Sequence, residues 1–435
     1  MSNPERIKAI ITKELPMKRG EKRVWIETQK IHDTDIAKQG YKYEYNLNYK
    51  TKKLTITPVE NGKERKVTLR KKNNMPVIDV NNKEMTKLFK DTERVTIKIY
   101  VSKIVIEPLK EEMEQNRARR KLKTKKPTFI DLFSGGSTLA KSLQDSGMEC
   151  VGAVEIEKDN VFGFELNLPN AMTYTSSIAD VDWNLMQDAT IISVAPPCTS
   201  YSIAGKKDGE DGDSGLFGIF TLNAVEIIRP GILILENTPL YRDSSVYKTI
   251  KFVLNLRGYK ITDAILDATA TGGMTKRKRL CMVATMADKP FEFDHSREFT
   301  FKSVRDILEV EIEDRVWLDE HNSKTMKYSL EVEKKHKAKG NGFKLGRVYL
   351  DSTLLPSVTA GYYKGRLTDA ILVHPNDETK FSWFTPRELA RINSLPDNFK
   401  LPSIKTRAGI IIGQGVDYSA FNKVGRDVLK HMKAA

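Results

Sequence analysis

From Thr128 onward the chain alternates short apolar runs with longer segments of mixed polarity, and this alternation constrains the fold more than any other feature. The runs lie at residues 129–133, 151–155, 191–195, 232–236 and 280–284. Short continuous apolar runs are typical of strands buried on both faces. Strands that alternate with helices form a mostly parallel sheet, which binds ligands at the carboxyl ends of its strands. The sequence therefore predicts an α/β fold with a mostly parallel sheet from residue 128.

Residues 1–110 have a different composition, rich in Lys, Thr, Tyr and Asn, with hydrophobic residues at alternate positions. Alternation of period two predicts half-buried strands, so we expect an N-terminal β-rich domain here. A faint internal repeat divides it, because residues 24–58 and 77–108 each predict a strand, a short helix and a hairpin ending at a proline. Two such units resemble the swapped hairpins of AbrB-type DNA-binding barrels. A small β domain used for folding or protein contacts is the alternative.

Residues 111–127 are expected to form a basic linker that can touch phosphates. The whole chain has a formal charge of +15 and a pI near 9.4, which favours nucleic acid over an anionic membrane as partner. No apolar stretch reaches the length of a membrane span, and the first residues lack the apolar core of a signal peptide. The three cysteines are far apart, which predicts no disulfide framework and no metal site and fits a reducing cytoplasm.

Polar residues stand at the ends of the predicted strands, where such a sheet binds ligands. Gly135 and Gly136 follow the first strand, and glycines let a ligand approach the backbone closely. Glu155 closes the second strand, as an acidic residue does when it binds ribose hydroxyls. Taken alone, the glycine turn is a weak signal, and Glu155 could simply lie near a helix N-cap.

A rigid Pro196-Pro197 pair presents Cys198 at the end of another strand, ahead of a glycine-rich segment. An isolated cysteine is more often a buried structural thiol, because free cysteine packs as a small hydrophobe. A thiolate held beside a closing loop is the catalytic alternative.

Glu236 ends the apolar run 232–236, where a carboxyl group is costly to bury and its pKa is expected to rise. Arg277 and Arg279 lie two residues apart before the last predicted strand. They therefore point the same way and can hold a polar ring.

Seven segments of residues 128–435, in order, resemble the motifs of DNA (cytosine-5)-methyltransferases. They are residues 131–135 (cofactor loop), 155–156 (ribose and adenine pair), 197–206 (nucleophile loop), 236–237, 277–279, 385–399 (ninth motif) and 413–416 (last motif). Each match is modest alone, but seven in sequence are specific.

The resemblance implies a Rossmann-like methyltransferase catalytic domain over 128–287 and a smaller target-recognition domain over 288–382. Residues 383–435 would return to the catalytic domain. It also implies S-adenosylmethionine as methyl donor, double-stranded DNA as substrate and a cognate restriction endonuclease as candidate partner, with no metal and no membrane. The implied cofactor-binding residues are Phe133, Gly135, Gly136, Glu155, Ile156, Ile178, Pro196, Gln414 and Val416.

By the same resemblance, the Cys198 thiolate adds to carbon 6 of a cytosine flipped out of the duplex. Glu236 would hydrogen-bond the ring at N3 and the exocyclic amine, Arg279 would hold the carbonyl O2, and Arg277 would support the nucleophile loop. The residues expected to contact DNA are Ser202, Lys206 and Lys207 in that loop and Tyr362, Tyr363, Lys364 and Arg366 in the recognition domain.

Five positions depart from the family pattern: Ser137, Ser177, Thr199, Thr275 and Gln414. They bear on cofactor affinity and rate more than on the reaction type. Two alternatives stay open, a tRNA methyltransferase of the same fold and a non-catalytic DNA-binding protein that kept it. The insert at 288–382 favours duplex DNA, and the retained Cys198, Glu236 and Arg279 favour an enzyme.

Overall fold

The computed structural model describes the chain except for residues 1–4, 61–64, 198–214, 298–301, 342–343 and 366–367. The chain divides into two compact units, Met1–Arg117 and Ala118–Ala435. The division falls within helix α3 (Lys110–Lys121), inside the segment predicted as a basic linker. None of the described helices is both long enough and apolar enough to cross a membrane.

The first unit consists of two β-sheets around one hydrophobic core. A six-stranded sheet has the order β1-β9-β10-β5-β4-β6, and a four-stranded sheet has the order β2-β3-β8-β7. The elements are β1 (Ile7–Glu14), β2 (Met17–Lys18), β3 (Glu21–Glu27), η1 (Gln29–Asp33), α1 (Asp35–Lys38), β4 (Lys42–Asn48), β5 (Lys53–Pro58), β6 (Arg65–Lys66), β7 (Thr68–Leu69), β8 (Pro76–Asn81), α2 (Lys83–Leu88), β9 (Arg94–Tyr100) and β10 (Ile104–Pro108).

Pairing between equivalent strands follows the internal repeat read from the sequence. β3 pairs antiparallel with β8, and β5 pairs antiparallel with β10, so two strands of each copy meet their counterparts, whereas β4 and β9 pair with other strands. Leu54 lies opposite Ile106, and Ile56 lies opposite Ile104. This is the register that a pseudo-twofold axis between the copies requires. The likeness to AbrB-type barrels stays a prediction.

The second unit contains a seven-stranded sheet with the order β13-β12-β11-β14-β15-β17-β16. In this sheet only β17 runs against its neighbours, so the predicted mostly parallel α/β fold is confirmed. The strands are β11 (Thr128–Leu132), β12 (Glu149–Glu155), β13 (Met172–Thr175), β14 (Ile191–Val194), β15 (Ile232–Asn237), β16 (Lys260–Asp267) and β17 (Lys278–Thr285).

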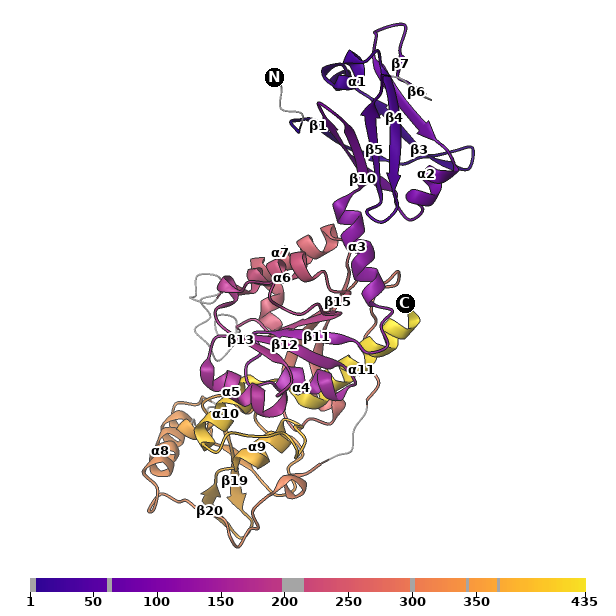
Figure 1. The fold of residues 1–435 in the computed structure, drawn as a ribbon. Coiled ribbons are helices and arrows are strands. Elements are labelled where there is room, and N and C mark those ends of the chain that lie inside the picture. Colours follow the sequence, from indigo (N-terminus) through magenta and orange to yellow (C-terminus); the bar gives the residue numbers. More distant parts are fainter. Residues whose placement is uncertain (1–4, 61–64, 198–214, 298–301, 342–343, 366–367) are drawn as a thin grey trace. The chain divides into compact units, whose positions relative to one another are not determined.

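Helices cover both faces of this sheet. Figure 1 shows α4, α5 and α11 on one side and α6 and α7 on the other. Their bounds are α4 (Thr138–Asp145), α5 (Lys158–Asn167), α6 (Thr221–Ile228), α7 (Ser245–Leu256) and α11 (Tyr418–Ala434), with short turns η2 (Ile178–Asp180), η4 (Phe217–Phe220), η5 (Pro239–Asp243) and η6 (Ala268–Thr271). Double coverage explains why β14 and β15 read as continuous apolar runs, since both faces of each strand are buried.

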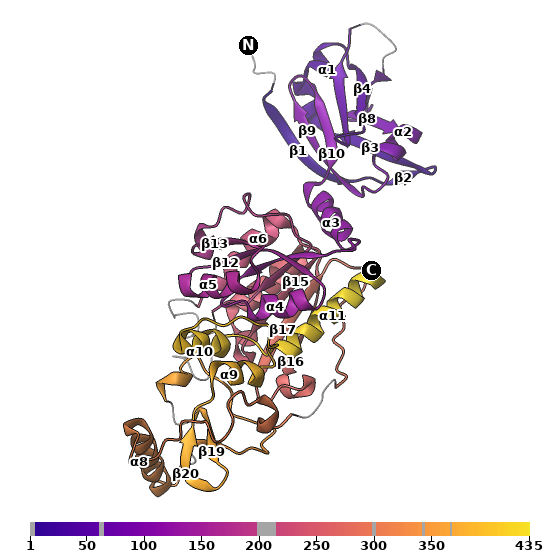
Figure 2. The ribbon, with the colours of Figure 1, turned by 60° about the horizontal axis from the view of Figure 1, so that its bottom comes forward.

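The insert between β17 and the C-terminal helices has its own small sheet, in the order β18-β19-β20. Its elements are η7 (Val304–Ile307), α8 (Lys324–Ala338), β18 (Gly346–Val348), η8 (Tyr362–Lys364), β19 (Ala370–His374) and β20 (Asp377–Ser382), followed by α9 (Pro386–Ile392) and α10 (Lys405–Gln414). Residues of α9 and α10 share one hydrophobic core with the insert, and α11 packs on α4. Figure 2 shows α9 and α10 beside the insert. The boundary predicted at residue 383 therefore runs through this core.

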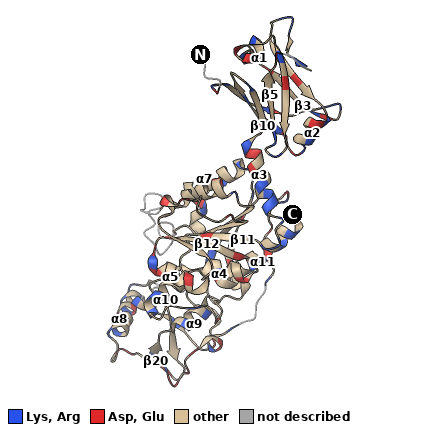
Figure 3. Ribbon diagram, in the orientation of Figure 1, with Lys and Arg blue, Asp and Glu red and all other residues tan. Residues whose placement is uncertain are grey.

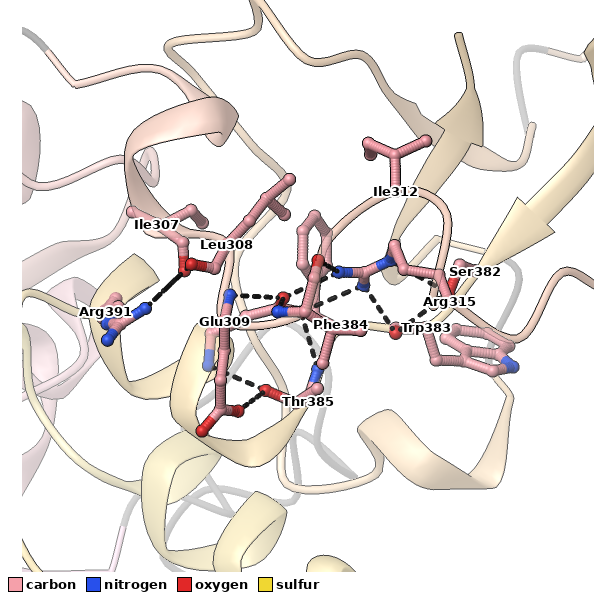
Figure 4. A network of polar contacts seen from close by, with 12 residues as sticks. Ile307, Leu308, Glu309, Ile312, Arg315, Ser382, Trp383, Phe384, Thr385 and Arg391 are labelled. Atoms are coloured by element: carbon pink, nitrogen blue, oxygen red, sulfur yellow. Dashed lines mark hydrogen bonds and ion pairs between the residues drawn. The ribbon is translucent and has the colours of Figure 1, made fainter. Parts of the chain in front are cut away.

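A buried ion pair fastens the insert to α9, and Figure 4 shows the polar network around its arginine, Arg315. Arg315 and Glu388 have side chains 2% and 0% exposed, with Nη1 and Oε1 2.7 Å apart. Glu388 also accepts hydrogen bonds from the backbone N–H groups of Glu309 and Thr385, while Arg315 donates to the carbonyl of Trp383. Burial alone would raise the pKa of Glu388, but these bonds outweigh it and hold the pKa below its usual value. The pair is thus fully hydrogen-bonded.

Replacing Arg315 by Met should destabilise the protein by about 3–5 kcal/mol, because Glu388 would remain buried without its counter-charge. This loss of stability can be measured by urea unfolding of the full chain, monitored by tryptophan fluorescence, since Trp317 and Trp383 lie in this region. The double substitution Arg315→Met/Glu388→Leu should cost less than the single one.

The matched control is the pair Arg305 and Asp351, whose Nε and Oδ1 atoms are 2.9 Å apart but whose side chains are 60% and 84% exposed. Arg305→Met should change stability by no more than about 1 kcal/mol. Equal losses at Arg305 and Arg315 would contradict the anchoring role of the buried pair.

Candidate active site

The turn after β11 has an unusual backbone. Phe133, Gly135 and Ser137 all have positive φ angles, of 57°, 51° and 76°. The carboxylate of Glu155, at the end of β12, fixes this turn: it accepts a hydrogen bond from the N–H of Gly135 at 2.7 Å and another from the N–H of Glu157 at 2.9 Å. A negative group thus organises backbone donors at the carboxyl edge of the sheet.

A cavity of about 400 Å³ opens over this turn. All nine residues that the resemblance assigned to the cofactor line it: Phe133, Gly135, Gly136, Glu155, Ile156, Ile178, Pro196, Gln414 and Val416. The same cavity is also lined by Pro197, Glu236 and Arg279. The geometry therefore joins the predicted cofactor-binding residues and two of the predicted catalytic residues, Glu236 and Arg279, in one continuous space.

The C-terminal part of the chain closes one wall of the cavity. Ile411 of α10 lies so close to the turn that a Cβ on Gly136 would be 2.4 Å from its Cγ2 atom. The N–H of Val416 donates to Oγ1 of Thr138, at the start of α4, at 3.1 Å. Only a residue without a side chain fits between the turn and α10 at position 136.

Glu236 and Arg279 form an ion pair at the other end of the cavity, with 2.8 Å between Nε of Arg279 and Oε1 of Glu236. Glu236 is 8% exposed. Burial raises its pKa, against the opposing charges of Arg279 and Arg277, so the carboxyl group binds a proton more readily than an ordinary glutamate. Because β17 is reversed, its first residues lie at the edge where β15 ends, which brings Arg279 to Glu236.

Asn237 has a positioning role that the sequence did not suggest. Its Nδ2 donates to the carbonyl of Pro196 at 3.0 Å, and its Oδ1 accepts from the N–H of Thr238. Asn237 therefore holds the diproline that leads to Cys198. The adjacency of Glu236 and Asn237 in the matched motif was the signal available.

Arg277 does not line this cavity. Its guanidinium donates to the carbonyls of Val358 and Gly413 at 3.1 Å each and to that of Gly415. It thus ties the end of α10 to β17. The loop that Arg277 was predicted to support lies outside the described residues, as do Cys198, Ser202, Lys206, Lys207 and Arg366.

The other two cysteines are poor nucleophiles. Cys150 and Cys281 are both buried, and burial raises the pKa of each thiol far above its usual value. A thiol must ionise to attack, so neither side chain is poised for nucleophilic chemistry.

The prediction that Tyr362 contacts DNA is wrong, because its side chain is fully buried. Its hydroxyl donates to the carbonyl of Ala370 at 2.7 Å and accepts from the N–H of Phe384 at 3.0 Å. Tyr363 is half-buried and donates to the carbonyl of Phe384. Of the predicted contacts in this segment that the structure describes, only Lys364 is exposed.

Ser137 stands where the family pattern has a glycine, and its φ of 76° explains that preference, since a Cβ is strained in this region. Its hydroxyl is buried and makes no hydrogen bond with the described residues.

Ser137→Gly should therefore stabilise the protein by about 1 kcal/mol, raising the melting temperature by about 2–4 °C. Ser142→Gly, inside α4, should lower it. A lower melting temperature for Ser137→Gly would contradict the strain argument.

Sequence comparison supports this reading of the site. Residues 127–430 match the family model for C-5 cytosine-specific DNA methylase. The type II methyltransferase M.DsaV of Dactylococcopsis salina is 26% identical over 325 residues, which cover 72% of this chain and 88% of that protein. M.HhaI of Haemophilus parahaemolyticus is 26% identical over 320 residues, covering 68% and 93%.

Solved structures share the fold. The Dnmt2 methyltransferase of S. pombe aligns with a TM-score of 0.57 at 16% identity, over 71% of this chain and 99% of that one. The methyltransferase EhMeth of Entamoeba histolytica gives the same TM-score at 17% identity, over 71% and 99%. With the family match covering most of the chain, the protein belongs to the C-5 cytosine-specific DNA methylases and is a DNA cytosine-5 methyltransferase that uses S-adenosylmethionine.

Proposed function

We propose that this enzyme methylates carbon 5 of a cytosine flipped out of a specific duplex sequence, with Cys198 as nucleophile and Glu236 and Arg279 as the groups that hold the base. The observation that carries the proposal is the single cavity that Glu236, Arg279 and Pro197 share with the glycine turn. A base held by Glu236 would lie beside a cofactor held at the turn. Cys198 follows Pro197 directly in the sequence.

The lining residues fit S-adenosylmethionine. Glu155 accepts one backbone N–H on each carboxylate oxygen and keeps lone pairs for ribose hydroxyls. The exposed Ile156 and the buried Ile178 offer apolar walls for adenine. Gly135 and Gly136 leave room for the ligand against the backbone. When bound, S-adenosylmethionine supplies the methyl group that carbon 5 receives.

The protein's own groups prepare the base. The Cys198 thiolate forms a bond to carbon 6, and the displaced electron pair makes carbon 5 nucleophilic. Protonated Glu236 donates to N3 and accepts from the exocyclic amine, which stabilises the ring as it becomes an enamine. Arg279 donates to O2. Removal of the proton on carbon 5 restores the double bond and expels the thiolate.

Finer proposals concern the setting of the enzyme. The names of the relatives as type II methyltransferases support a cognate restriction endonuclease for the same sequence, acting with it in the cytoplasm. We further propose that the N-terminal β-rich domain binds DNA. Residues 1–117 carry 27 Lys and Arg against 17 Asp and Glu, a net +10 of the total +15.

Cys198→Ala should abolish transfer of labelled methyl from S-adenosylmethionine to unmethylated duplex DNA, while DNA binding persists, because only the covalent step is lost. Cys150→Ala, a buried cysteine away from the cavity, is the matched control and should keep activity. Turnover by Cys198→Ala would refute the nucleophile assignment. If the wild-type enzyme labelled tRNA but not DNA in a parallel assay, the proposal that DNA is the substrate would be wrong.

Activity should fall as pH rises through the pKa of Glu236, since the protonated carboxyl is the active form and burial raises this pKa. On the acid side, activity should fall as the thiolate is protonated, which gives a bell-shaped pH profile of kcat/KM. Glu236→Gln stays neutral and can still donate to N3. It should lower the rate by about 10²–10⁴-fold and remove the alkaline limb. An unchanged alkaline limb in this variant would assign that limb to another group.

A further inference from the structure

The run Lys276-Arg277-Lys278-Arg279 leads into β17 and divides its four cations between two environments. Side chains alternate along an extended chain. Arg277 is buried on backbone carbonyls and Arg279 meets Glu236, whereas Lys276 and Lys278 are exposed. Arg279 therefore lines the active-site cavity and Arg277 fastens the backbone beside it, while the two lysines face elsewhere.

Both lysines line a second cavity, of about 380 Å³. Its walls come from the loop between β16 and β17 and from the insert, whose contributions are Lys302, Thr353 and Leu354. The two walls are joined by a bridge between Thr275 and Leu355 and by a hydrogen bond from the N–H of Leu355 to the carbonyl of Met274 at 2.7 Å. The cavity thus lies where the catalytic sheet meets the recognition domain.

Positive charge exceeds negative charge in this cavity, although the carboxylates of Asp306 and Asp397 interact electrostatically with Lys302. Three ammonium groups, on Lys276, Lys278 and Lys302, line it together with a single carboxylate, that of Asp267. Asp267 accepts from the N–H and Oγ1 of Thr269, at 3.0 and 2.8 Å. In the part of the chain that the structure describes, no Asp or Glu forms an ion pair with any of the three lysines.

Basic residues also gather at the C-terminal ends of α3 and α8, but there they lie on helix surfaces and line neither this cavity nor the active-site cavity. Acidic and basic residues are mixed over most of the ribbon (Figure 3). Lys251 and Lys423, for example, each lie within salt-bridge distance of an aspartate. Three like charges gathered in one hollow repel one another and favour binding of an anion.

The position of the cavity identifies the anion. Lys278 is the first residue of β17 and is followed directly by Arg279, which reaches the carboxyl group assigned to the target base. Gly272, with a φ of 88°, leaves the cavity wall without a side chain. A DNA strand whose cytosine enters the Glu236 pocket must carry its phosphates past the same edge of the sheet.

We infer that this cavity binds a backbone phosphate of the DNA strand that carries the target cytosine, next to the flipped nucleotide. The inference rests on the proposed base-binding role of Glu236 and Arg279. Lysines act here as point charges that neutralise the phosphate, and the hydroxyl of Thr353 is a further donor. Contacts of this kind set the register of the strand without reading its sequence.

The test is the salt dependence of DNA binding by the full chain, measured by fluorescence anisotropy with a labelled mixed-sequence duplex. Phosphate contacts do not depend on sequence, so the recognition site need not be known. The triple variant Lys276→Gln/Lys278→Gln/Lys302→Gln should bind more weakly at low salt. Its slope of log K against log salt should fall by about 1 or more. The matching Lys→Arg variant should keep the wild-type slope.

Lys430→Gln is the matched control. Lys430 is exposed near the end of α11, next to His431, whose ring bonds to Thr285 at the far end of β17. An unchanged slope in the triple variant, or an equal drop in Lys430→Gln, would overturn the inference. Calorimetry with S-adenosylmethionine should give wild-type affinity for the triple variant, which shows that it is folded. Wild-type protein that binds the duplex but transfers no methyl group would contradict the proposed function, whereas the phosphate contact itself is decided by the salt slopes alone.

Discussion

A carboxyl group at the end of a strand buried on both faces cannot stay ionised unless a cation is fixed beside it, and Glu236 meets this condition through Arg279. Burial raises the pKa of Glu236, and the guanidinium opposes that rise. The result is a carboxyl group that can carry a proton and still accept a hydrogen bond. Arg279 is the second residue of β17, so it lies beside Glu236 only if β17 begins at the edge of the sheet where β15 ends. The reversal of β17 within an otherwise parallel sheet is therefore a requirement of the site.

The remaining contacts keep three distant parts of the sequence around this pair. Asn237 holds the diproline through the carbonyl of Pro196. Arg277 holds the end of α10 through the carbonyls of Gly413 and Gly415, which keeps the neighbouring Gln414 in the cavity wall. A Cβ at position 413 would lie 2.2 Å from the backbone N of Ala360. Only glycine fits at this position, because the two backbones approach each other so closely. The site depends on backbone packing as much as on reactive side chains.

Topology predicted where the cavity lies, because the carboxyl ends of parallel strands meet at one edge of the sheet. The nine cofactor residues came from the resemblance to the family, and all nine line this one space. The prediction for Tyr362 was wrong because a tyrosine among basic residues has the same local sequence pattern whether it contacts DNA or packs in a core. Only the partners of its hydroxyl, on Ala370 and Phe384, decide the question. The sequence shows that Ser137 departs from the glycine of the family pattern, but only the φ angle in the structure shows that its backbone is strained.

Net charge explains little of how the second unit can attract DNA. Residues 118–435 carry 45 Lys and Arg against 40 Asp and Glu, so this unit is close to balanced, and most of the excess lies in residues 1–117. The attraction of DNA to the region around the active-site cavity must then come from a local excess of positive charge. The run 276–279 supplies it through strand alternation. Arg277 is matched by backbone carbonyls and Arg279 by Glu236, while Lys276 and Lys278 form no ion pair with the acidic residues that the structure describes. One short segment can thus combine chemistry on one face with electrostatic attraction on the other.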